Sequence, residues 1–274
     1  LPNGLSPFIH RCKEKGLKFG IWVEPEMINL KSELAEQHPE WIMRSPNRQD
    51  LFLRNQLDLD LSNPAVQDFC FGVVDKTLSQ NPGISYVKWD EHRHVENFGS
   101  TYLPAQEQSE LWIKYVQGLN KVYERLRAKY PDVIFQACAS GGGRSDLGTM
   151  KYHNEFWASD NTDAQSRVKI NWGFSYLYPA NAIASHVSHV PNHQTKRVIP
   201  IKFRFDVAMA ERLGIELQPR KLDSTETAWL HLAVPAYKKI RETVQLGELY
   251  RLLSPYTSAT AAKMYTSEQK AKAV

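Results

Sequence analysis

The stretch ISYVKWD, residues 84–90, decides the fold. Its apolar and β-branched residues end on an aspartate, as in a buried strand whose last side chain is delivered to the edge of a sheet. Lys88 and Asp90 are two positions apart, so they point to the same side of such a strand. A lysine beside a carboxylate favours its ionised form. The stretch therefore predicts a buried strand that presents a charged pair at its carboxyl end.

A second stretch, FWASDNTD at residues 156–163, has the same character. It offers two acids, Asp160 and Asp163. We expect Asp163 to cap a helix that begins near Ala164, which leaves Asp160, closer to the strand end, as the better proton donor. Two rigid carboxyls beside aromatic rings are what cleavage of a glycosidic bond requires, one as nucleophile and one as acid. This pairing is our leading hypothesis for the function.

Strand patterns alternate with helical patterns along most of the chain. Strands are expected at residues 16–23, 51–59, 84–90, 133–137 and 155–158, and helices at 6–14, 64–78, 106–128, 167–176, 206–213 and 235–246. Such alternation favours parallel β/α units, and polar residues at strand ends are typical of a (β/α)₈ barrel. Fewer than eight units can be counted, so the α/β TIM-barrel domain, residues 1–248, looks incomplete at its N-terminus. Residues 249–274 do not continue the alternation of strands and helices, and they predict the start of a C-terminal β-domain.

The bulk composition excludes several classes of protein. The 274 residues carry 34 basic and 30 acidic side chains, and the basic ones do not form a stripe. The charge pattern therefore gives no indication of a nucleic-acid-binding surface. No apolar run is long enough to span a membrane. Three cysteines without paired spacing indicate neither a zinc site nor a disulfide framework. No signal-peptide pattern is present, which slightly favours the cytoplasm, but the chain opens without methionine and the compartment stays open.

Other motifs have both a structural and a functional interpretation. The glycine run after Cys138 is either a flexible turn or a tight loop that approaches a ligand, with Arg144 as its anchor. Trp22 either fills the core or stacks on a sugar, and Glu24 and Glu26 beyond it are expected to be in structural pairs. Arg54 follows three apolar residues, so we expect its charge to have a partner or a ligand. The histidines at 186, 189 and 193 fit no zinc signature.

Taken together, six segments resemble glycoside hydrolase family 36, the bacterial-type α-galactosidases. They occur in the family's order and cover nearly the whole chain: WVEPEM at 22–27, RNQ at 54–56, YVKWD at 86–90, CxxGxxR at 138–144, WxSDNTD at 157–163 and PNHQT at 191–195. The resemblance implies a retaining double displacement, with Asp90 as nucleophile and Asp160 as acid and base. It implies no metal or organic cofactor. The residues expected to bind the galactosyl group of an α-galactoside oligosaccharide are Trp22, Arg54, Lys88, Cys138, Gly141 and Trp157.

The chain departs from the family pattern in places. His92, Lys196 and the pair Ala210–Glu211 stand where the family usually has Asn, Gly and Ser-Gly, and of these only His92 is near enough to bear on the substrate. A β-sandwich domain and the first barrel strands precede this segment in the family, so we expect a segment of the catalytic domain that is poorly stable and nearly inactive alone. Family members are often tetramers, and a homo-oligomer is expected of the full-length protein.

Three alternatives stay open at this stage. The same chemistry could serve a transglycosylase that builds raffinose-type sugars, or an α-N-acetylgalactosaminidase. A thiol and a tight glycine turn at 138–141 favour a plain 2-hydroxyl, hence galactose. A non-catalytic sugar-binding protein is the third alternative, and the presence of both aspartates argues against it.

Overall fold

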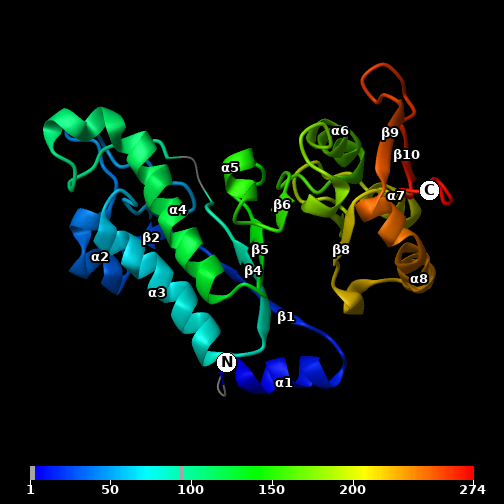
Figure 1. Ribbon diagram of the computed structural model, residues 1–274, viewed down its shortest axis with the longest axis horizontal. Coiled ribbons are helices and arrows are strands. Elements are labelled where there is room, and N and C mark those ends of the chain that lie inside the picture. The colour runs from blue at the N-terminus through cyan, green and yellow to red at the C-terminus, as the bar shows by residue number, and fades with distance from the viewer. Residues whose placement is uncertain (1–3, 93–94) are drawn as a thin grey trace. The chain divides into compact units, whose positions relative to one another are not determined.

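The computed structural model describes residues 4–92 and 95–274, and the chain divides into two compact units, Leu1–Asn154 and Glu155–Val274. Each unit contains a sheet of three parallel strands with helices packed against it (Figure 1). The expected α/β architecture, in which parallel strands alternate with helices, is therefore confirmed within each unit. No helix in the described part of the chain is both long and apolar enough to cross a membrane.

The first unit places β4 between β1 and β5. In register, Trp22 lies opposite Lys88, and Lys88 opposite Gln136, so these side chains share one face of the sheet. An antiparallel pair, β2 and β3, stands apart from this sheet. The elements of the unit are α1 (Ser6–Glu14), β1 (Phe19–Val23), β2 (Met27–Asn29), α2 (Glu33–Gln37), η1 (Pro39–Trp41), β3 (Gln56–Asp58), α3 (Pro64–Gln80), β4 (Ile84–Trp89), η2 (Ala105–Glu110), α4 (Leu111–Lys129), β5 (Ile134–Ala137) and α5 (Leu147–Met150).

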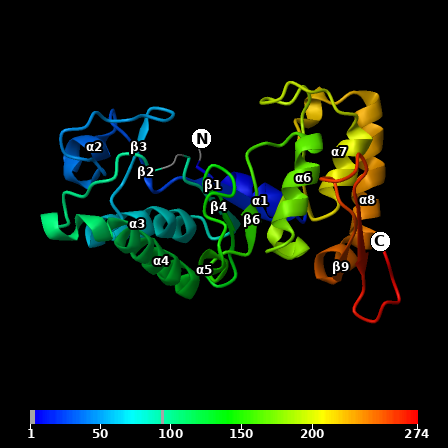
Figure 2. The same ribbon diagram turned by 90° about the horizontal axis from the view of Figure 1, so that it is seen from above.

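Helices α3 and α4 lie side by side along the first unit (Figure 2). Helix α3 begins as expected, because the Asn63 side chain accepts a hydrogen bond of 2.9 Å from the amide of Ala65 and Pro64 occupies its first turn. The two helices bury one core with the sheet, to which α3 contributes Val66 and Cys70, α4 Leu119 and Val122, and β4 Val87 and Trp89. This core fixes the strand end that carries Asp90.

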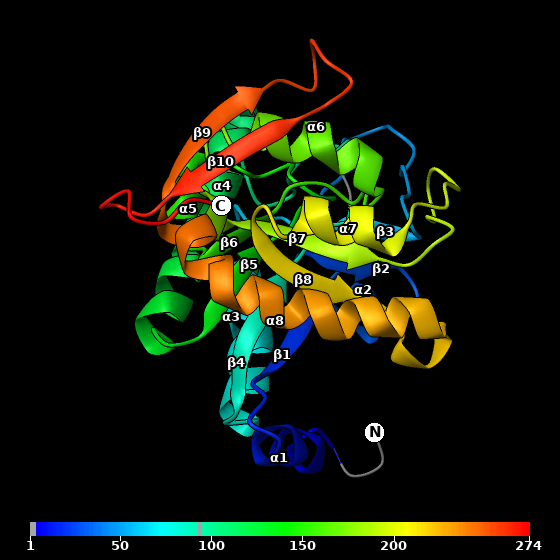
Figure 3. The ribbon, with the colours of Figure 1, turned by 90° about the vertical axis from the view of Figure 1, so that its right-hand side faces the viewer.

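The second unit places β7 between β6 and β8, again in parallel. Strands β9 and β10 then form an antiparallel pair (Figure 3). The elements of the unit are β6 (Glu155–Trp157), α6 (Ala164–Phe174), η3 (Ala180–Ala182), β7 (Ile183–Ser188), α7 (Ile201–Ala208), β8 (Arg212–Glu216), η4 (Pro219–Lys221), α8 (Ser224–Leu246), β9 (Glu248–Leu253) and β10 (Ala262–Thr266).

Three segments differ from the sequence-based expectation. The extended stretch at 51–59 is interrupted, because Arg54 and Asn55 have φ of 54° and 60° and form a tight turn before β3. The helix expected at 206–213 is instead the end of α7 and the start of β8. Strand β7, with the sequence IASHVS, was not expected, because its small and polar residues lack the β-branched pattern; pairing with both neighbours makes it a strand.

Candidate active site

The carboxyl ends of β1, β4 and β5 gather most of the expected site residues of the first unit. Backbone hydrogen bonds join these ends: the amide of Asp90 donates to Val23 at 3.0 Å, and the amide of Cys138 donates to Trp89 at 2.9 Å. Trp22, Lys88, Asp90 and Cys138 are therefore delivered to one edge of the sheet. Functional residues of parallel β/α folds collect at such an edge.

The two carboxylate oxygens of Asp90 have different environments. Oδ2 accepts a hydrogen bond of 3.0 Å from the indole N–H of Trp22 and lies 3.2 Å from Nε2 of His92. Oδ1 is buried, and no donor among the described residues is bonded to it. The whole residue is 1% exposed. Asp90 thus has one oxygen that is held in place and one that is available for chemistry.

A buried network supports both residues that flank Asp90. The carboxylate of Glu26 accepts hydrogen bonds from Trp89 at 2.5 Å, Tyr115 at 2.6 Å and Arg144 at 2.6 Å. Nη2 of Arg144 also lies 2.8 Å from Oε2 of Glu91. One guanidinium therefore holds Glu91 directly and Trp89 through Glu26, so the chain is fixed on either side of Asp90. The structural pairing expected of Glu24 and Glu26 is confirmed, since Glu26 pairs with Arg144 and Glu24 with His92.

Burial dominates the protonation of this network. Desolvation raises the pKa of Glu91 to about 8, even though Arg144 opposes the rise. For Arg144, desolvation alone would lower the pKa, but Glu26 and Glu91 outweigh it and raise the pKa above its usual range. Arg144 is thus a permanent cation beside two buried acids, and burial raises the pKa of one of them, Glu91.

The loop after β5 brings backbone close to this edge of the sheet. Gly141 has a backbone φ of 92°, which residues with a side chain rarely adopt. Its carbonyl accepts a hydrogen bond of 2.9 Å from the amide of Ala139. A Cβ on Gly143 would lie 2.6 Å from the carbonyl oxygen of Ala139. The thiol of Cys138 is buried, and this burial, reinforced by Asp90, raises its pKa. The loop is therefore tight, and its cysteine is a neutral thiol.

Arg54 is not brought to the strand ends in this way. It lies at the exposed tip of the turn before β3 and has no hydrogen bond or ion pair with the other described residues. The three apolar residues before it are about half exposed, so they do not bury its charge. Of the two interpretations of Arg54 from the sequence, a protein partner is wrong for the described residues, and a ligand stays a prediction.

In the second unit, a tryptophan side chain is hydrogen-bonded to the candidate acid, Asp160. The indole N–H of Trp157 donates a hydrogen bond of 3.0 Å to Oδ1 of Asp160. The guanidinium of Arg167 lies 4.4 Å from the centre of the Trp157 ring and is 1% exposed. It donates a hydrogen bond of 2.8 Å to the carbonyl of Asn161 and another to the carbonyl of Ser159. Arg167 therefore grips the backbone on both sides of Asp160.

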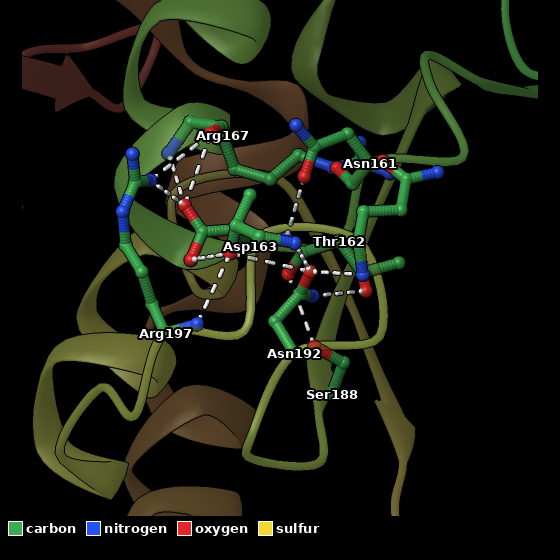
Figure 4. Close-up of polar contacts among 10 residues, drawn as sticks. Asn161, Thr162, Asp163, Arg167, Ser188, Asn192 and Arg197 are labelled. Carbon is green, nitrogen blue, oxygen red and sulfur yellow. Dashed lines mark hydrogen bonds and ion pairs between the residues drawn. The ribbon is translucent and has the colours of Figure 1, made fainter.

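Asp163 has the structural role expected of it. It caps α6 by accepting a hydrogen bond of 3.0 Å from the amide of Ser166, and it pairs with Arg197 at 2.5 Å (Figure 4). Burial works against its ionisation, but these hydrogen bonds outweigh burial and hold its pKa below the usual range. Nearby, Asn192 donates a hydrogen bond of 3.1 Å to the hydroxyl of Thr162 (Figure 4). The loop after β7 thus braces the loop that carries Asp160.

No group of three or more potential metal ligands occurs within residues 4–92 and 95–274. The ring of His186 packs against Trp157 at a tilt of 46°, with ring centres 4.4 Å apart. The rings of His189 and His193 are 6.4 Å apart.

Two residues that support the candidate catalytic groups, one through the backbone and one by direct contact, are not identified by the sequence. Arg167 is one, because a single arginine in a helical pattern looks like any solvated residue. His92 is the other: its position two residues after Asp90 was noted, but its contact with the carboxylate was not expected. A charged residue close in sequence to a candidate acid is the only signal that could have identified either.

Known proteins resemble this chain over its whole length. The family model described as Melibiase matches residues 1–247. The α-galactosidase AgaA of Geobacillus stearothermophilus is 44% identical over 274 residues, which is 100% of this chain and 37% of that protein. The chain thus spans little more than a third of this relative.

Two crystal structures of AgaA variants match with TM-scores of 0.96 at 43% identity, covering 100% of this chain and 38% of theirs. One is described as a complex with stachyose and the other as a complex with raffinose. The stachyose complex has an aspartate replaced by alanine, and the raffinose complex has an aspartate replaced by asparagine; these two aspartates are 70 positions apart.

Proposed function

This chain belongs to the melibiase family, and on that premise we propose that it is the part of a retaining α-galactosidase that carries both catalytic aspartates. The substrate we propose is a terminal α-galactosyl group of an oligosaccharide. Stachyose and raffinose, the sugars named for the AgaA complexes, represent this class.

The observation that carries the proposal is the asymmetry of Asp90. A nucleophile needs an ionised oxygen that is fixed in direction and not already bonded to the protein. Trp22 and His92 engage Oδ2, whereas Oδ1 is buried without a hydrogen-bond donor among the residues the structure describes. This is the arrangement expected of a carboxylate that attacks through Oδ1.

The reaction follows as two displacements at the anomeric carbon. A lone pair of Asp90 Oδ1 forms a bond to C1 while the glycosidic C1–O bond breaks, and Asp160 gives its proton to the leaving oxygen. Water then attacks C1 of the galactosyl ester, Asp160 takes a proton from that water, and Asp90 leaves as a carboxylate. The two carboxyls should be about 5 Å apart for this retaining course.

The spacing in sequence supports this choice of residues. Asp90 and Asp160 are 70 positions apart, the same separation as the two aspartates replaced in the AgaA complexes. Replacing a catalytic carboxylate is a common way to hold an intact substrate in a crystal. A chain that aligns over its full length preserves such a spacing when no insertion intervenes.

The loop after β5 supports galactose over its 2-acetamido relative. Gly141 and Gly143 let the backbone turn tightly beside Cys138, and the Gly143 position has no room even for a Cβ. A 2-acetamido group needs space where the family places this loop, next to the 2-hydroxyl. We therefore propose that the pocket takes the plain 2-hydroxyl, with Trp22, Lys88 and Trp157 around the ring.

The remaining parts of the proposal concern the whole protein. We propose that the parallel strands of the two units belong to one (β/α)₈ barrel formed by residues 1–248 with chain beyond this segment, and that residues 249–274 begin a β-domain. The antiparallel pairing of β9 and β10 supports the second point. The expected homo-oligomer stays a prediction, which sedimentation velocity tests.

The function is tested with the protein that contains this chain. Galactose release from raffinose and from an aryl α-galactoside should be lost almost completely in Asp90→Asn. Asp160→Asn should lose about 10²–10⁴-fold on raffinose and less on the aryl substrate, whose leaving group needs little protonation. The exposed Asp132→Asn is the matched control. NMR should show α-galactose as the first product; β-galactose, or an active Asp90→Asn, would overturn the mechanism.

A further inference from the structure

His92 lies between two carboxylates that come from different strand ends. Its Nδ1 is hydrogen-bonded to Oε1 of Glu24, which follows β1. Its Nε2 is 3.2 Å from Oδ2 of Asp90, which follows β4. The ring centre is also 5.4 Å from that of Trp22, the residue that donates to the same oxygen of Asp90. The side chain is 14% exposed, so water does not intervene freely.

This placement dictates how many protons the ring carries. A neutral imidazole has one N–H donor and one lone-pair acceptor, whereas an ionised carboxylate only accepts. With a carboxylate oxygen at each nitrogen, a neutral ring would direct a lone pair at one of them. Only the imidazolium, with both nitrogens protonated, is complementary to both Glu24 and Asp90.

The charges around the ring favour the same state. Glu24 and Asp90 face it directly, and the network beneath adds Glu26. The permanent cations nearby are Arg144, which is paired to Glu26, and Lys88 on the same side of β4 as Asp90. Glu91 is largely neutral near pH 7, as burial raises its pKa to about 8. An imidazolium at position 92 therefore places a cation between the two carboxylates that face it, Glu24 and Asp90.

We propose that His92 is a positioning residue for the nucleophile: as an imidazolium between Glu24 and Asp90, it holds Oδ2 of Asp90 and keeps the carboxylate ionised while Oδ1 attacks. This inference rests on the proposed function and adds the charge state of His92 to the contact with Oδ2 that was used there. When the galactosyl ester forms at Oδ1, the negative charge of Asp90 is lost. When water cleaves the ester, the charge returns, and the imidazolium stabilises the departing carboxylate.

The test is the pH profile of kcat/KM for His92→Asn in the protein that contains this chain. Asparagine can donate a hydrogen bond but carries no charge. Without the cation beside Asp90, the acid limb of the profile should move up by about 1 pH unit, because a neighbouring opposite charge favours the ionised carboxylate. The exposed His10→Asn should leave the profile unchanged. A merely structural role would lower kcat without moving the limb, and that result would overturn the proposal.

A second measurement does not depend on the folding of a variant. In ¹⁵N-labelled wild-type protein at pH 7, both ring nitrogens of His92 should show the chemical shifts of protonated imidazolium. A neutral His92 ring in the wild type at pH 7 would overturn the proposal. Failure of the proposed function would look different, as the wild type itself would then release no galactose.

Discussion

The indole N–H of Trp22 lies 3.0 Å from Oδ2 of Asp90, and the same relationship recurs between Trp157 and Oδ1 of Asp160. In both units the tryptophan belongs to a strand and the aspartate follows the end of a strand. An indole N–H donates but cannot accept, so it fixes a carboxylate oxygen without competing for a proton. Each candidate catalytic group therefore has one oxygen anchored by a rigid ring.

Trp22→Phe tests this anchor at Asp90. The substitution removes the N–H and keeps most of the ring, and a hydrogen bond to a charged group contributes about 1.5–3 kcal/mol. If that stabilisation is needed in the transition state, kcat/KM on an aryl α-galactoside should fall about 10- to 100-fold. Trp112→Phe, an exposed tryptophan of α4, is the matched control. Wild-type kinetics in Trp22→Phe would mean that the indole acts only through its ring.

The second prediction concerns Glu91 and the pH dependence of stability. Burial raises its pKa to about 8 in the folded protein, whereas the unfolded value is near 4.5. The folded state then binds the extra proton, so the contribution of Glu91 to stability is fully present below about pH 4.5 and is lost as the pH rises toward about 8. In Glu91→Gln this contribution is absent, and the unfolding free energy of the variant relative to wild type should rise across that range.

Urea unfolding at pH 5 and pH 8.5 measures this difference. The exposed Glu242→Gln on α8 should show no such trend. If Glu91 instead remained ionised as a partner of Arg144, the variant would be the less stable protein at pH 8.5. That outcome would contradict the direction of the shift.

The third prediction concerns a buried ion pair of the second unit. Glu211 is 0% exposed, and its carboxylate is 2.7 Å from Nζ of Lys263 on β10 and 2.9 Å from the side-chain amide of Asn171. Lys263→Met would leave Glu211 charged and without its cation. Stability measured by urea should fall by about 3–5 kcal/mol.

A double variant separates this loss from a simple packing defect. Glu211→Gln in the Lys263→Met background removes the uncompensated charge, so it should recover part of the stability. Lys239→Met, at an exposed position of α8, is the control and should change little. If the double variant were no more stable than Lys263→Met alone, the charge would not be the cause.

The sequence predicted the parts of this fold in which local pattern and tertiary role coincide. Strand β4 is mostly apolar up to Asp90, with Ser85 and Lys88 as its polar residues, so both its burial and the acid that follows it could be read directly. Helix α3 carries its own start signal in Asn63 and Pro64. Strand β7 has no such pattern, because alanine, serine and histidine form a strand there only through their neighbours. Strand propensity does not predict a strand such as β7, because its pairing with the neighbouring strands, and not its side chains, determines its structure.

The candidate site shows the same difference between residues with a local sequence signal and residues placed by long-range contacts. Asp90 and Asp160 were found because an acid at the end of a strand is a local signal. The residues that hold them in place were predicted only in part: Trp22 and Trp157 were singled out, but the contact between Glu24 and His92, which are 68 positions apart, forms only in the folded sheet. The helix that carries Arg167 was expected, but its pattern does not indicate that this side chain turns back to bond the carbonyl of Ser159. A residue that takes part in the reaction can be recognised from its local sequence. The residues that contact it depend on how distant strands and helices pack in the fold.

The last prediction concerns Arg167 and the loop of Asp160. Its guanidinium bonds the carbonyls of Ser159 and Asn161 at once, which uses the planar fork of donors that only arginine has. Arg167→Lys keeps the charge, but one ammonium group cannot hold both carbonyls in the same geometry. Asp160 should then lose alignment with the leaving oxygen, while Asp90, in the other unit, keeps its own supports.

The kinetic signature follows from the role of Asp160 as an acid. Protonation matters most when the leaving group is poor, and positioned acids contribute about 10²–10⁴-fold. Arg167→Lys should therefore lose more rate on raffinose than on an aryl α-galactoside, with the exposed Arg220→Lys as the control. A general loss of folding would slow both substrates by the same factor. Equal losses, or a larger loss on the aryl substrate, would show that Arg167 does not act through Asp160.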